Sequence, residues 1–189
     1  MNVTKKSILL AFLFSVVAIS VYVYAVRLKK VEVKDLSSYP TFIAMDTDTV
    51  FFNKTGKIDK TMVATKTEYY DNKTFYKFDN PLITSYNYKK DSTDLWHIKG
   101  LTGEMVANKT ATVKQNVIVY PSFNDPVIDR ATADNLEYNF DNNDISSKDL
   151  VSIYGHTFKT EGTDFNFNLN TNVLTYKGKP HATYYPQNK

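Results

Sequence analysis

One pattern recurs four times along the chain: an Asn at a turn, followed by a Tyr 12 or 14 residues later. The Asn residues lie 36, 34 and 30 residues apart. Asn favours turns, and Tyr suits the half-buried surface of a strand, so each copy predicts a hairpin. A repeat of this length predicts a stack in which each hairpin contacts mainly its neighbours. The four pairs are Asn72 with Tyr86, Asn108 with Tyr120, Asn142 with Tyr154 and Asn172 with Tyr184.

The first two copies, in the stretch from Met62 to Tyr120, resemble each other most closely. In both, a short strand ending on or near a Glu precedes the turn Asn, and a strand that begins near a Thr follows it. A second Asn, Asn80 or Asn116, comes eight residues after the turn Asn. The rest of the folded part is predicted to contain two more copies of this unit.

Strand-like segments separated by turn residues make up the remainder of the chain. No segment after residue 26 keeps a helical period over three turns, so the sequence predicts an all-β sandwich, barrel or stack of antiparallel hairpins. The predicted strands are Thr49–Phe52, Met62–Tyr70, Phe75–Phe78, Leu82–Tyr88, Leu95–Ile98, Gly103–Ala107, Thr110–Tyr120, Leu136–Phe140, Leu150–Tyr154, Phe165–Leu169, Val173–Tyr176 and Ala182–Tyr185.

Several of these strands alternate strictly between apolar and polar residues. Phe165, Phe167 and Leu169, for example, are separated by Asn166 and Asn168. Such alternation gives a strand one apolar and one wet face, and the apolar faces together would line a common interior. In a closed sandwich this interior is simply the core, whereas in an open one it is a groove able to hold acyl chains.

The N-terminal segment Ser7–Val26 is 20 residues long and carries no charge. At 1.5 Å per residue, an α-helix of this length crosses a hydrocarbon core of ~30 Å. A signal peptide cleaved after Val23-Tyr24-Ala25 is the alternative, but its apolar core is usually about 7–15 residues long. We therefore predict an uncleaved anchor over 7–26. A buried core helix is disfavoured because the segment has no polar face.

The anchor divides the chain into a cytoplasmic tail over 1–6, a connector over 27–40 and a β-domain over 41–189. Lys5 and Lys6 precede the anchor, and Arg27, Lys29, Lys30 and Lys34 follow it. By itself this charge distribution favours an orientation with the β-domain in the cytoplasm. A long domain behind a single helix is nevertheless translocated largely regardless of charge. We expect the N-terminus in the cytoplasm and the β-domain outside it.

Charge and cysteine content limit what the chain can do. From Arg27 onward the chain has 21 basic residues, all but two of its 23, against 20 acidic ones. A nucleic-acid-binding protein should show a basic excess or a basic stripe, so the charge balance argues against this class. The chain has no Cys, which excludes both a disulfide framework and thiolate chemistry.

No catalytic arrangement is evident. His97, His156 and His181 are isolated and lack metal-site spacing, and the sequence has neither a phosphate-binding glycine loop nor a nucleophile elbow. We therefore predict no enzyme activity and no cofactor. Trp96 is predicted to be a core residue.

Two recurring residue types admit a second interpretation. Glu68, Glu104 and Glu137 recur at one point of the repeat, and paired carboxylates can hydrolyse glycosides. A solvated row of side chains is the favoured interpretation. The Tyr residues could stack on sugars, although packing across neighbouring strands is favoured. A carbohydrate-binding or hydrolytic jelly roll is therefore the alternative function, and a purely structural envelope protein is a third.

Four stretches carry a resemblance to a known family. They are Met45-Asp46-Thr47-Asp48-Thr49, Glu68-Tyr69-Tyr70, Asp79-Asn80-Pro81-Leu82-Ile83-Thr84 and the run from Ser146 to Phe158, which contains D-L-V-x-x-Y-G-x-x-F. With the N-terminal apolar segment and the repeated hairpins, they make the chain similar over essentially its whole length to the lipopolysaccharide export protein LptC family. The last run is the most specific of the four.

The resemblance implies a single-pass inner-membrane protein with a periplasmic β-jellyroll domain that opens as a V-shaped groove. It implies that this domain receives lipopolysaccharide from an ATP-driven inner-membrane ABC-transporter complex. The lipid would then pass, edge to edge, to a periplasmic bridge protein of similar fold. Such a protein is non-enzymatic, and its energy comes from the transporter.

Within that fold, alternation assigns the residues. The predicted groove lining is Phe78, Ile98, Met105, Val117, Val119, Leu136, Tyr138, Phe140, Ile153, Phe165, Phe167, Leu174 and Tyr184. The predicted partner edges are Thr49, Val50 and Phe51 toward the inner-membrane complex, and Ala182, Tyr184 and Tyr185 toward the bridge protein. Gly56 and Gly155 are predicted at turns that require a positive φ. A register error of one residue would turn any strand inside out.

Overall fold

The computed structural model describes residues 13–24, 39–71, 74–107, 109–123 and 126–185. The chain divides into two units, Met1–Ser38 and Tyr39–Lys189. In the first unit, residues 13–24 form a helix, where the Ser20 hydroxyl donates a hydrogen bond of 2.8 Å to the Val16 carbonyl.

None of the helical segments in the described ranges combines the length and the apolar character needed to cross a membrane. The predicted anchor covers 7–26, and its residues 7–12 and 25–26 lie outside the described residues. The predicted tail over 1–6 and residues 27–38 of the connector lie outside them as well. The anchor and the division of the chain therefore stay predictions.

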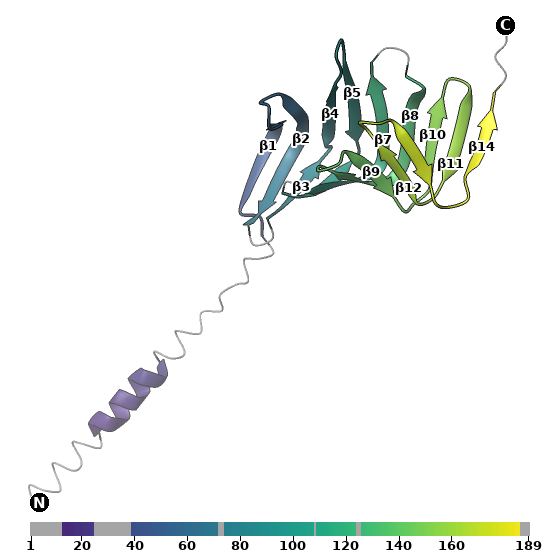
Figure 1. The fold of residues 1–189 in the computed structure, drawn as a ribbon. Helices are drawn as coiled ribbons and strands as arrows, with labels where there is room; N and C mark the ends of the chain where they lie inside the picture. Colours follow the sequence, from purple (N-terminus) through teal and green to yellow (C-terminus); the bar gives the residue numbers. More distant parts are fainter. Residues whose placement is uncertain (1–12, 25–38, 72–73, 108, 124–125, 186–189) are drawn as a thin grey trace, which may run out of the picture. The chain divides into compact units, whose positions relative to one another are not determined.

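The second unit contains a single antiparallel sheet of 14 strands, which confirms the all-β prediction (Figure 1). The strands are β1 (Phe42–Phe52), β2 (Ile58–Tyr70), β3 (Phe75–Asp79), β4 (Leu82–Tyr88), β5 (Thr93–Lys99), β6 (Thr102–Val106), β7 (Thr110–Ser122), β8 (Ile128–Asn139), β9 (Asp144–Ser147), β10 (Val151–Gly155), β11 (Phe158–Gly162), β12 (Phe165–Asn168), β13 (Val173–Tyr176) and β14 (His181–Tyr184).

The sheet is folded along its length into two half-sheets, because its long strands change partners midway. The first part of β2 pairs with β4 and its second part with β3. In the same way β7 pairs with β6 and then β5, and β8 with β10 and then β9. We call the strands β4, β5, β10, β11 and β14 the first half-sheet, and β3, β6, β9, β12 and β13 the second. Figure 1 shows the second half-sheet crossing beneath the first.

Residues with positive φ mark the line where the chain passes between the half-sheets. Asn80 (φ 49°) lies between β3 and β4, and Asp164 (φ 51°) lies between β11 and β12. In β7, Gln115 (φ 65°) and Asn116 (φ 54°) form a bulge at which the pairing with β8 shifts register. Asn and Asp tolerate this conformation better than most residues, and a bulge bends the strand that contains it. Asn80 and Asn116 are therefore equivalent positions of the repeat, as predicted.

The four hairpins of the repeat are present. Asn142 and Asn172 lie in the turns that join β8 to β9 and β12 to β13. Asn72 and Asn108 lie outside the described residues, but β2 pairs with β3 and β6 with β7 on either side of them. In each copy the second strand of the hairpin lies on the side of the second half-sheet, and the chain then continues toward the first half-sheet. Tyr86, Tyr154 and Tyr184 lie there on β4, β10 and β14, and Tyr120 lies on the part of β7 that pairs with β5.

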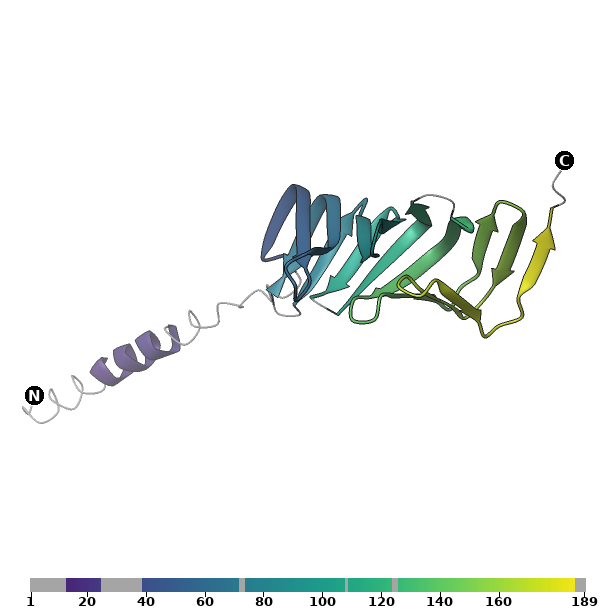
Figure 2. The ribbon, with the colours of Figure 1, turned by 45° about the horizontal axis from the view of Figure 1, so that its top comes forward.

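The structure has two strands that the sequence pattern did not predict, β9 and β11. Strand β9 is four residues long and has one apolar residue, Ile145. Strand β11 has the sequence Phe-Lys-Thr-Glu-Gly, in which apolar and polar residues do not clearly alternate. Most of its side chains are half-buried. Strands β1 and β8 also begin earlier than predicted. Figure 2 shows β14 (yellow) as the last strand at the C-terminal edge.

The inner faces of the two half-sheets meet in one core. Ile83 and Ile98 from the first half-sheet and Leu136, Ile145 and Leu169 from the second side are almost completely buried. Burying one such side chain contributes about 1.5–3 kcal/mol. Trp96 is also buried, as predicted. The middle of the interior is therefore filled by the protein's own side chains.

Candidate functional site

The predicted groove residues of the second half-sheet share its inner face. Cross-strand pairing joins Met105 to Ala111, Ala111 to Tyr138, Tyr138 to Ile145, Ile145 to Phe167 and Phe167 to Leu174. This row runs across six strands and contains four predicted groove residues. Phe78, Leu136, Phe140 and Phe165 are buried against the same core.

The first half-sheet contributes a second row. Pairing joins Ile98 to Val119, Val119 to Ala131, Ala131 to Ile153, Ile153 to Thr160 and Thr160 to Ala182. Since side chains two residues apart in a strand share a face, Tyr184 lies on the inner face next to Ala182. Tyr184 is 76% exposed, so the inner face is uncovered at this end.

Burial separates the thirteen predicted groove residues into two groups. Eleven are buried, including Val117, whereas Leu174 is half-buried and Tyr184 is exposed. A remaining cavity of only about 10 Å³ lies among Trp96, Val119 and Phe165. The faces of these side chains agree with the prediction. Lipid binding by them stays a prediction, and the middle of the interior is closed.

Larger cavities lie on either side of this closed middle. One of about 480 Å³ is lined by β1, β2, β3 and β6, and its walls include Phe51, Met62 and the predicted groove residues Phe78 and Met105. Another of about 510 Å³ is lined by Trp96, by the β7–β8 loop and by Phe167 of β12. We call them the N-terminal cavity and the Trp96 cavity.

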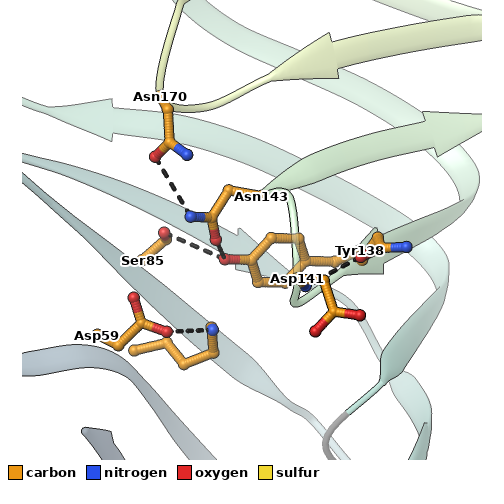
Figure 3. A network of polar contacts seen from close by, with 8 residues as sticks. Asp59, Ser85, Tyr138, Asp141, Asn143 and Asn170 are labelled. Carbon is orange, nitrogen blue, oxygen red and sulfur yellow. Dashed lines mark hydrogen bonds and ion pairs between the residues drawn. The ribbon is translucent and has the colours of Figure 1, made fainter. Parts of the chain in front are cut away.

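A polar network joins the two half-sheets across the interior (Figure 3). The Tyr138 hydroxyl lies 3.1 Å from Ser85 Oγ on β4 and 2.6 Å from Asn143 Oδ1 in the β8–β9 turn. Asn143 Nδ2 donates to Asn170 Oδ1 at 3.2 Å, and Asn87 Nδ2 of β4 donates to the Asn170 carbonyl at 3.3 Å. We call these five residues the interior bridge. Burial raises the pKa of Tyr138 well above its ordinary value of 10.0, so its phenol stays neutral.

Lys60 places a buried positive charge beside the interior bridge. It pairs with Ser85 in the strand register and is only 4% exposed. Its ammonium forms an ion pair with Asp59 and lies 4.9 Å from the centre of the Phe140 ring. The carboxylate and the ring face together compensate the buried charge. The sequence analysis did not identify Lys60, Ser85 or Asn87 as inward residues. It assigned inward positions to apolar residues, and these three are polar.

The outer face of the second half-sheet carries the predicted Glu row. Glu68 pairs with Lys77 across the sheet, Lys77 with Glu104, and Thr112 with both Glu104 and Glu137. Salt bridges join Glu68 to Lys66 at 2.6 Å and Glu104 to Lys114 at 2.8 Å.

Hydrogen bonds from Lys66 and Tyr70 lower the pKa of Glu68, so this carboxylate stays ionised. Glu137 is exposed. The row is therefore a solvated one, as favoured by the sequence, and its ion-paired carboxylates do not form the acid and base pair of a glycosidase.

The outer-face tyrosines pack on neighbouring strands. Tyr120 stacks on His97 with ring centres 4.9 Å apart. The Tyr154 ring lies 4.3 Å from the Arg130 guanidinium and 5.5 Å from the Lys159 ammonium. These contacts agree with cross-strand packing rather than an open sugar-binding platform.

The histidines provide no metal site. His97 is hydrogen-bonded to Thr84 at 3.0 Å, and burial lowers its pKa. His156 lies 3.4 Å from Asp129, and His181 is exposed on β14. Within the described part of the chain, no group of three or more His, Asp or Glu side chains could hold a metal ion.

The first half-sheet, the strands β2, β7 and β8, which it shares with the second half-sheet, and β1 form one row of strands. The ends of this row are β1 and β14. Among the described strands, β1 pairs only with β2, and β14 pairs only with β11. Of the predicted edge residues, Thr49, Val50, Ala182, Tyr184 and Tyr185 are exposed. The Phe51 side chain instead packs into the interior, 5.9 Å from the Phe140 ring, so β1 offers its backbone rather than this side chain.

The two predicted turn glycines differ. Gly56 has φ +80°, as predicted, with open space around it. The prediction of a positive φ at Gly155 is wrong, since this residue ends β10 in an ordinary conformation. Close packing explains the glycine there, because a Cβ would lie 2.7 Å from the Val127 carbonyl oxygen and 2.6 Å from Phe158 Cζ.

Comparison with known proteins agrees with this geometry. A sequence model of the family described as "Lipopolysaccharide-assembly, LptC-related" matches residues 8–185. The chain is 29% identical over 150 residues to the "Lipopolysaccharide export system protein LptC" of Escherichia coli K12, covering 79% of this chain and 78% of that protein. The proteins of the same name from Escherichia coli O157:H7 and Shigella flexneri match equally well. The chain therefore belongs to the LptC-related lipopolysaccharide-assembly family.

Proposed function

We propose that this protein is a non-enzymatic component of lipopolysaccharide export, whose β-domain carries the lipid along its interior. It receives lipopolysaccharide from an ATP-driven extractor in the inner membrane and passes it to a periplasmic bridge protein of similar fold. Family membership supports the general role, because the relatives bear the name of lipopolysaccharide export proteins.

One observation carries the proposal: the inner faces form two rows of side chains, apolar except for Tyr138 and Thr160, and each row runs across six strands of the sheet. The row through Met105 and Phe167 begins at the N-terminal cavity and passes Tyr138 in the middle. The row of the first half-sheet ends beside Tyr184, where the face is exposed. Apolar surface offers acyl chains about 25 cal/mol for each Å² removed from water. A largely apolar path therefore holds a lipid at many positions with similar affinity.

The half-sheets must separate for the lipid to pass. The middle of the interior is filled, and the bridge from Ser85 through Tyr138 to Asn143 joins the half-sheets there. Acyl chains would replace the contacts that the inner faces make with each other. Replacing these contacts by contacts with acyl chains changes the free energy little. The main free-energy cost of separation is therefore breaking the hydrogen bonds of the interior bridge.

The end strands supply the contacts with partners. An uncovered strand edge can add a strand from another protein, because its outward backbone groups have no neighbour in the sheet. We assign β1, with Thr49 and Val50, to the inner-membrane complex and β14, with Ala182 and Tyr185, to the bridge protein. The uncleaved anchor over 7–26 would hold the N-terminus in the cytoplasm and the β-domain in the periplasm.

Site-specific photo-crosslinking tests the proposal. A benzophenone amino acid at Phe78 in the N-terminal cavity, or at Tyr184 on the uncovered inner face, should capture lipopolysaccharide in growing cells. The same group at Glu137, which is exposed on the outer face, is the matched control. Capture at Glu137 but at neither inner position would contradict a lipid path through the interior. A carbohydrate-binding function would instead show soluble-glycan binding that depends on Tyr120 or Tyr154.

A further inference from the structure

The turns at the free end of the first half-sheet carry a cluster of lysines. Lys54 and Lys57 belong to the β1–β2 turn, and Lys89 and Lys90 belong to the β4–β5 turn. All four residues are exposed. Strand β2 pairs with β4, so the two turns are neighbours (Figure 1), and the Lys57 ammonium lies 4.9 Å from the centre of the Tyr88 ring. We call the four lysines the lysine rim.

Most of the positive charge of the lysine rim is not neutralised by the protein. Among the residues that the structure describes, Lys89 alone of the four forms an ion pair, and its partner is the buried Asp94. Asp91 is the single exposed acidic residue in these two turns. The turns therefore present an excess of positive charge to solvent.

Hydrogen bonds fix the shape of both turns. The Asn53 side-chain oxygen accepts hydrogen bonds from the backbone N–H groups of Thr55 and Lys57 at 2.9 and 3.0 Å. In the β4–β5 turn, the Lys89 N–H donates to the Ser92 carbonyl at 2.8 Å. Because the backbone of these turns is already ordered, a ligand that binds their lysines does not have to order it.

The lysine rim borders the interior on the side where no strand runs from one half-sheet to the other. On the opposite side, β2, β7 and β8 continue unbroken between the half-sheets. Beside the β4–β5 turn, Asn87 Nδ2 donates to the Asn170 carbonyl at 3.3 Å, and beside the β1–β2 turn the Phe51 ring lies 5.9 Å from Phe140. A lipid whose acyl chains enter between the half-sheets therefore leaves its head group beside the lysine rim.

The facing turns of the second half-sheet carry different side chains. Asp141 and Asn142 in the β8–β9 turn and Asn170 and Asn172 in the β12–β13 turn are exposed. Amide side chains both donate and accept hydrogen bonds, which suits the hydroxyl groups of a sugar. Lysine binds phosphate groups as a point charge. The two sides of the opening therefore match the two components of a phosphorylated sugar.

We propose that the lysine rim binds the phosphate groups of the transported glycolipid while its acyl chains lie in the interior. The asparagines of the facing turns contact the sugar hydroxyls. This inference rests on the proposed function. It adds recognition of the head group to an interior whose apolar walls distinguish a lipid only by its chains.

Three forms of one glycolipid test the lysine rim on the full-length protein in detergent solution. Lipid A with two phosphates, with one phosphate and with none has the same sugars and acyl chains. Each phosphate removed should weaken binding about two- to tenfold. Added salt should weaken binding of the bisphosphorylated form most, because salt screens exposed charges. Equal affinity for the three forms would overturn the proposal.

A triple substitution provides an independent measurement. Lys54→Gln, Lys57→Gln and Lys90→Gln together remove three positive charges from the rim and leave the interior unchanged. Binding of bisphosphorylated lipid A should fall about three- to thirtyfold, and binding of the unphosphorylated form should change less than twofold. Equal losses for the two forms would show that the substitutions act on folding or on chain binding and would overturn the proposal.

Three exposed lysines away from the rim provide the matched control. Lys77→Gln, Lys99→Gln and Lys148→Gln change the net charge by the same amount. This variant should bind both forms of lipid A as the unchanged protein does. A loss as large as that of the rim variant would show that the net charge of the domain attracts the lipid, and would overturn a role for the rim.

Phospholipids of the membrane are a second source of phosphate groups. Phosphatidylglycerol has a single phosphate and no sugar, so an excess of it should displace little bisphosphorylated lipid A. Complete displacement would show that the rim binds anionic lipids in general and would overturn recognition of the glycolipid head group.

Photo-crosslinking at Phe78 separates failure of this inference from failure of the proposed function. Capture of lipopolysaccharide at Phe78, together with equal affinities of the rim variant and the unchanged protein, overturns the lysine rim alone. A loss of affinity in the rim variant without capture at Phe78 supports head-group binding and counts against transport through the interior.

Discussion

The Tyr138 hydroxyl lies 3.1 Å from Ser85 Oγ, which is a contact between residues 53 positions apart in the sequence. Ser85 lies on β4 of the first half-sheet, and Tyr138 lies on the part of β8 that pairs with β9 of the second. Both residues are buried, at 1% and 4% exposure. The amide oxygen of Asn143 can only accept, so it takes the Tyr138 hydrogen and leaves Ser85 as the donor to the phenol oxygen. This pair marks the point at which the apolar interior is held together by polar groups.

Removing the Tyr138 hydroxyl should destabilise the β-domain. In Tyr138→Phe, the buried Ser85 hydroxyl and the Asn143 amide oxygen lose a partner, which should lower the free energy of unfolding by about 1–3 kcal/mol. Urea denaturation followed by circular dichroism measures this change. Tyr120→Phe is the matched control on the outer face, and a loss of the same size there would contradict a specific role for the bridge.

The β-domain should lose stability in alkaline solution. Burial raises the pKa of Tyr138 well above 10.0 and that of Tyr176 to about 12. Between pH 10 and these raised values, the unfolded chain releases phenol protons that the folded chain retains, so stability falls as pH rises. Stability from these groups is fully present below pH 10.

Urea titrations at pH 8 and at pH 11 should show this loss. The pH dependence should be smaller in Tyr138→Phe than in the unchanged protein. An identical decrease in both would show that other groups cause the alkaline destabilisation.

Clamping the half-sheets together should stop lipid from reaching the C-terminal end. The chain has no cysteine, so Asn87→Cys with Asn170→Cys can be joined by a short bis-maleimide without side reactions. The N-terminal cavity lies at β1, β2, β3 and β6, whereas Tyr184 lies beyond the bridge on β14. The clamped protein should capture lipopolysaccharide at Phe78 but lose most capture at Tyr184.

The same double variant without the bis-maleimide is the control and should capture at both positions. Undiminished capture at Tyr184 after clamping would show that lipid does not need the half-sheets to separate.

Removing β14 should weaken transfer while leaving the domain folded. The strand is short, its residues are exposed and it pairs only with β11, so ending the chain after Gly178 should cost little stability. The new edge, β11, presents Lys159 and Glu161 and is a poor template for another strand. The affinity for the bridge protein, measured by biolayer interferometry, should fall at least about tenfold. Unchanged binding with an unchanged unfolding curve would contradict the assignment of β14.

Gly155 should tolerate no side chain. In Gly155→Ala, the added methyl would meet the Val127 carbonyl and the Phe158 ring, which should lower the free energy of unfolding by about 1–3 kcal/mol. Gly56→Asn is the control, because its positive φ suits Asn and nothing lies within 4 Å. Thermal unfolding of the two variants compares them directly, and a larger loss at position 56 would contradict the packing explanation.

Local patterns predicted most of the secondary structure because they reflect local physics. Asn80 and Asn116 occupy equivalent positions of the repeat, as predicted, and the alternation of Phe165 and Phe167 with Asn166 identified an inner face. Such patterns failed where a strand has no alternation. Strand β11 was missed because its inner face is only partly covered, and the prediction for Gly155 was wrong because one close neighbour, the Val127 carbonyl, comes from a loop distant in the sequence.

The sequence by itself determined the all-β class, the hairpin repeat and the face that each alternating strand turns inward, since a period of two residues is a property of neighbouring residues. Only the tertiary structure decided that the interior is closed in its middle and hollow on both sides. That outcome depends on contacts such as Tyr138 with Ser85 and Asn87 with Leu169, which lie 53 and 82 residues apart. No local pattern encodes the distance between two half-sheets, because it is set by which distant side chains meet across it.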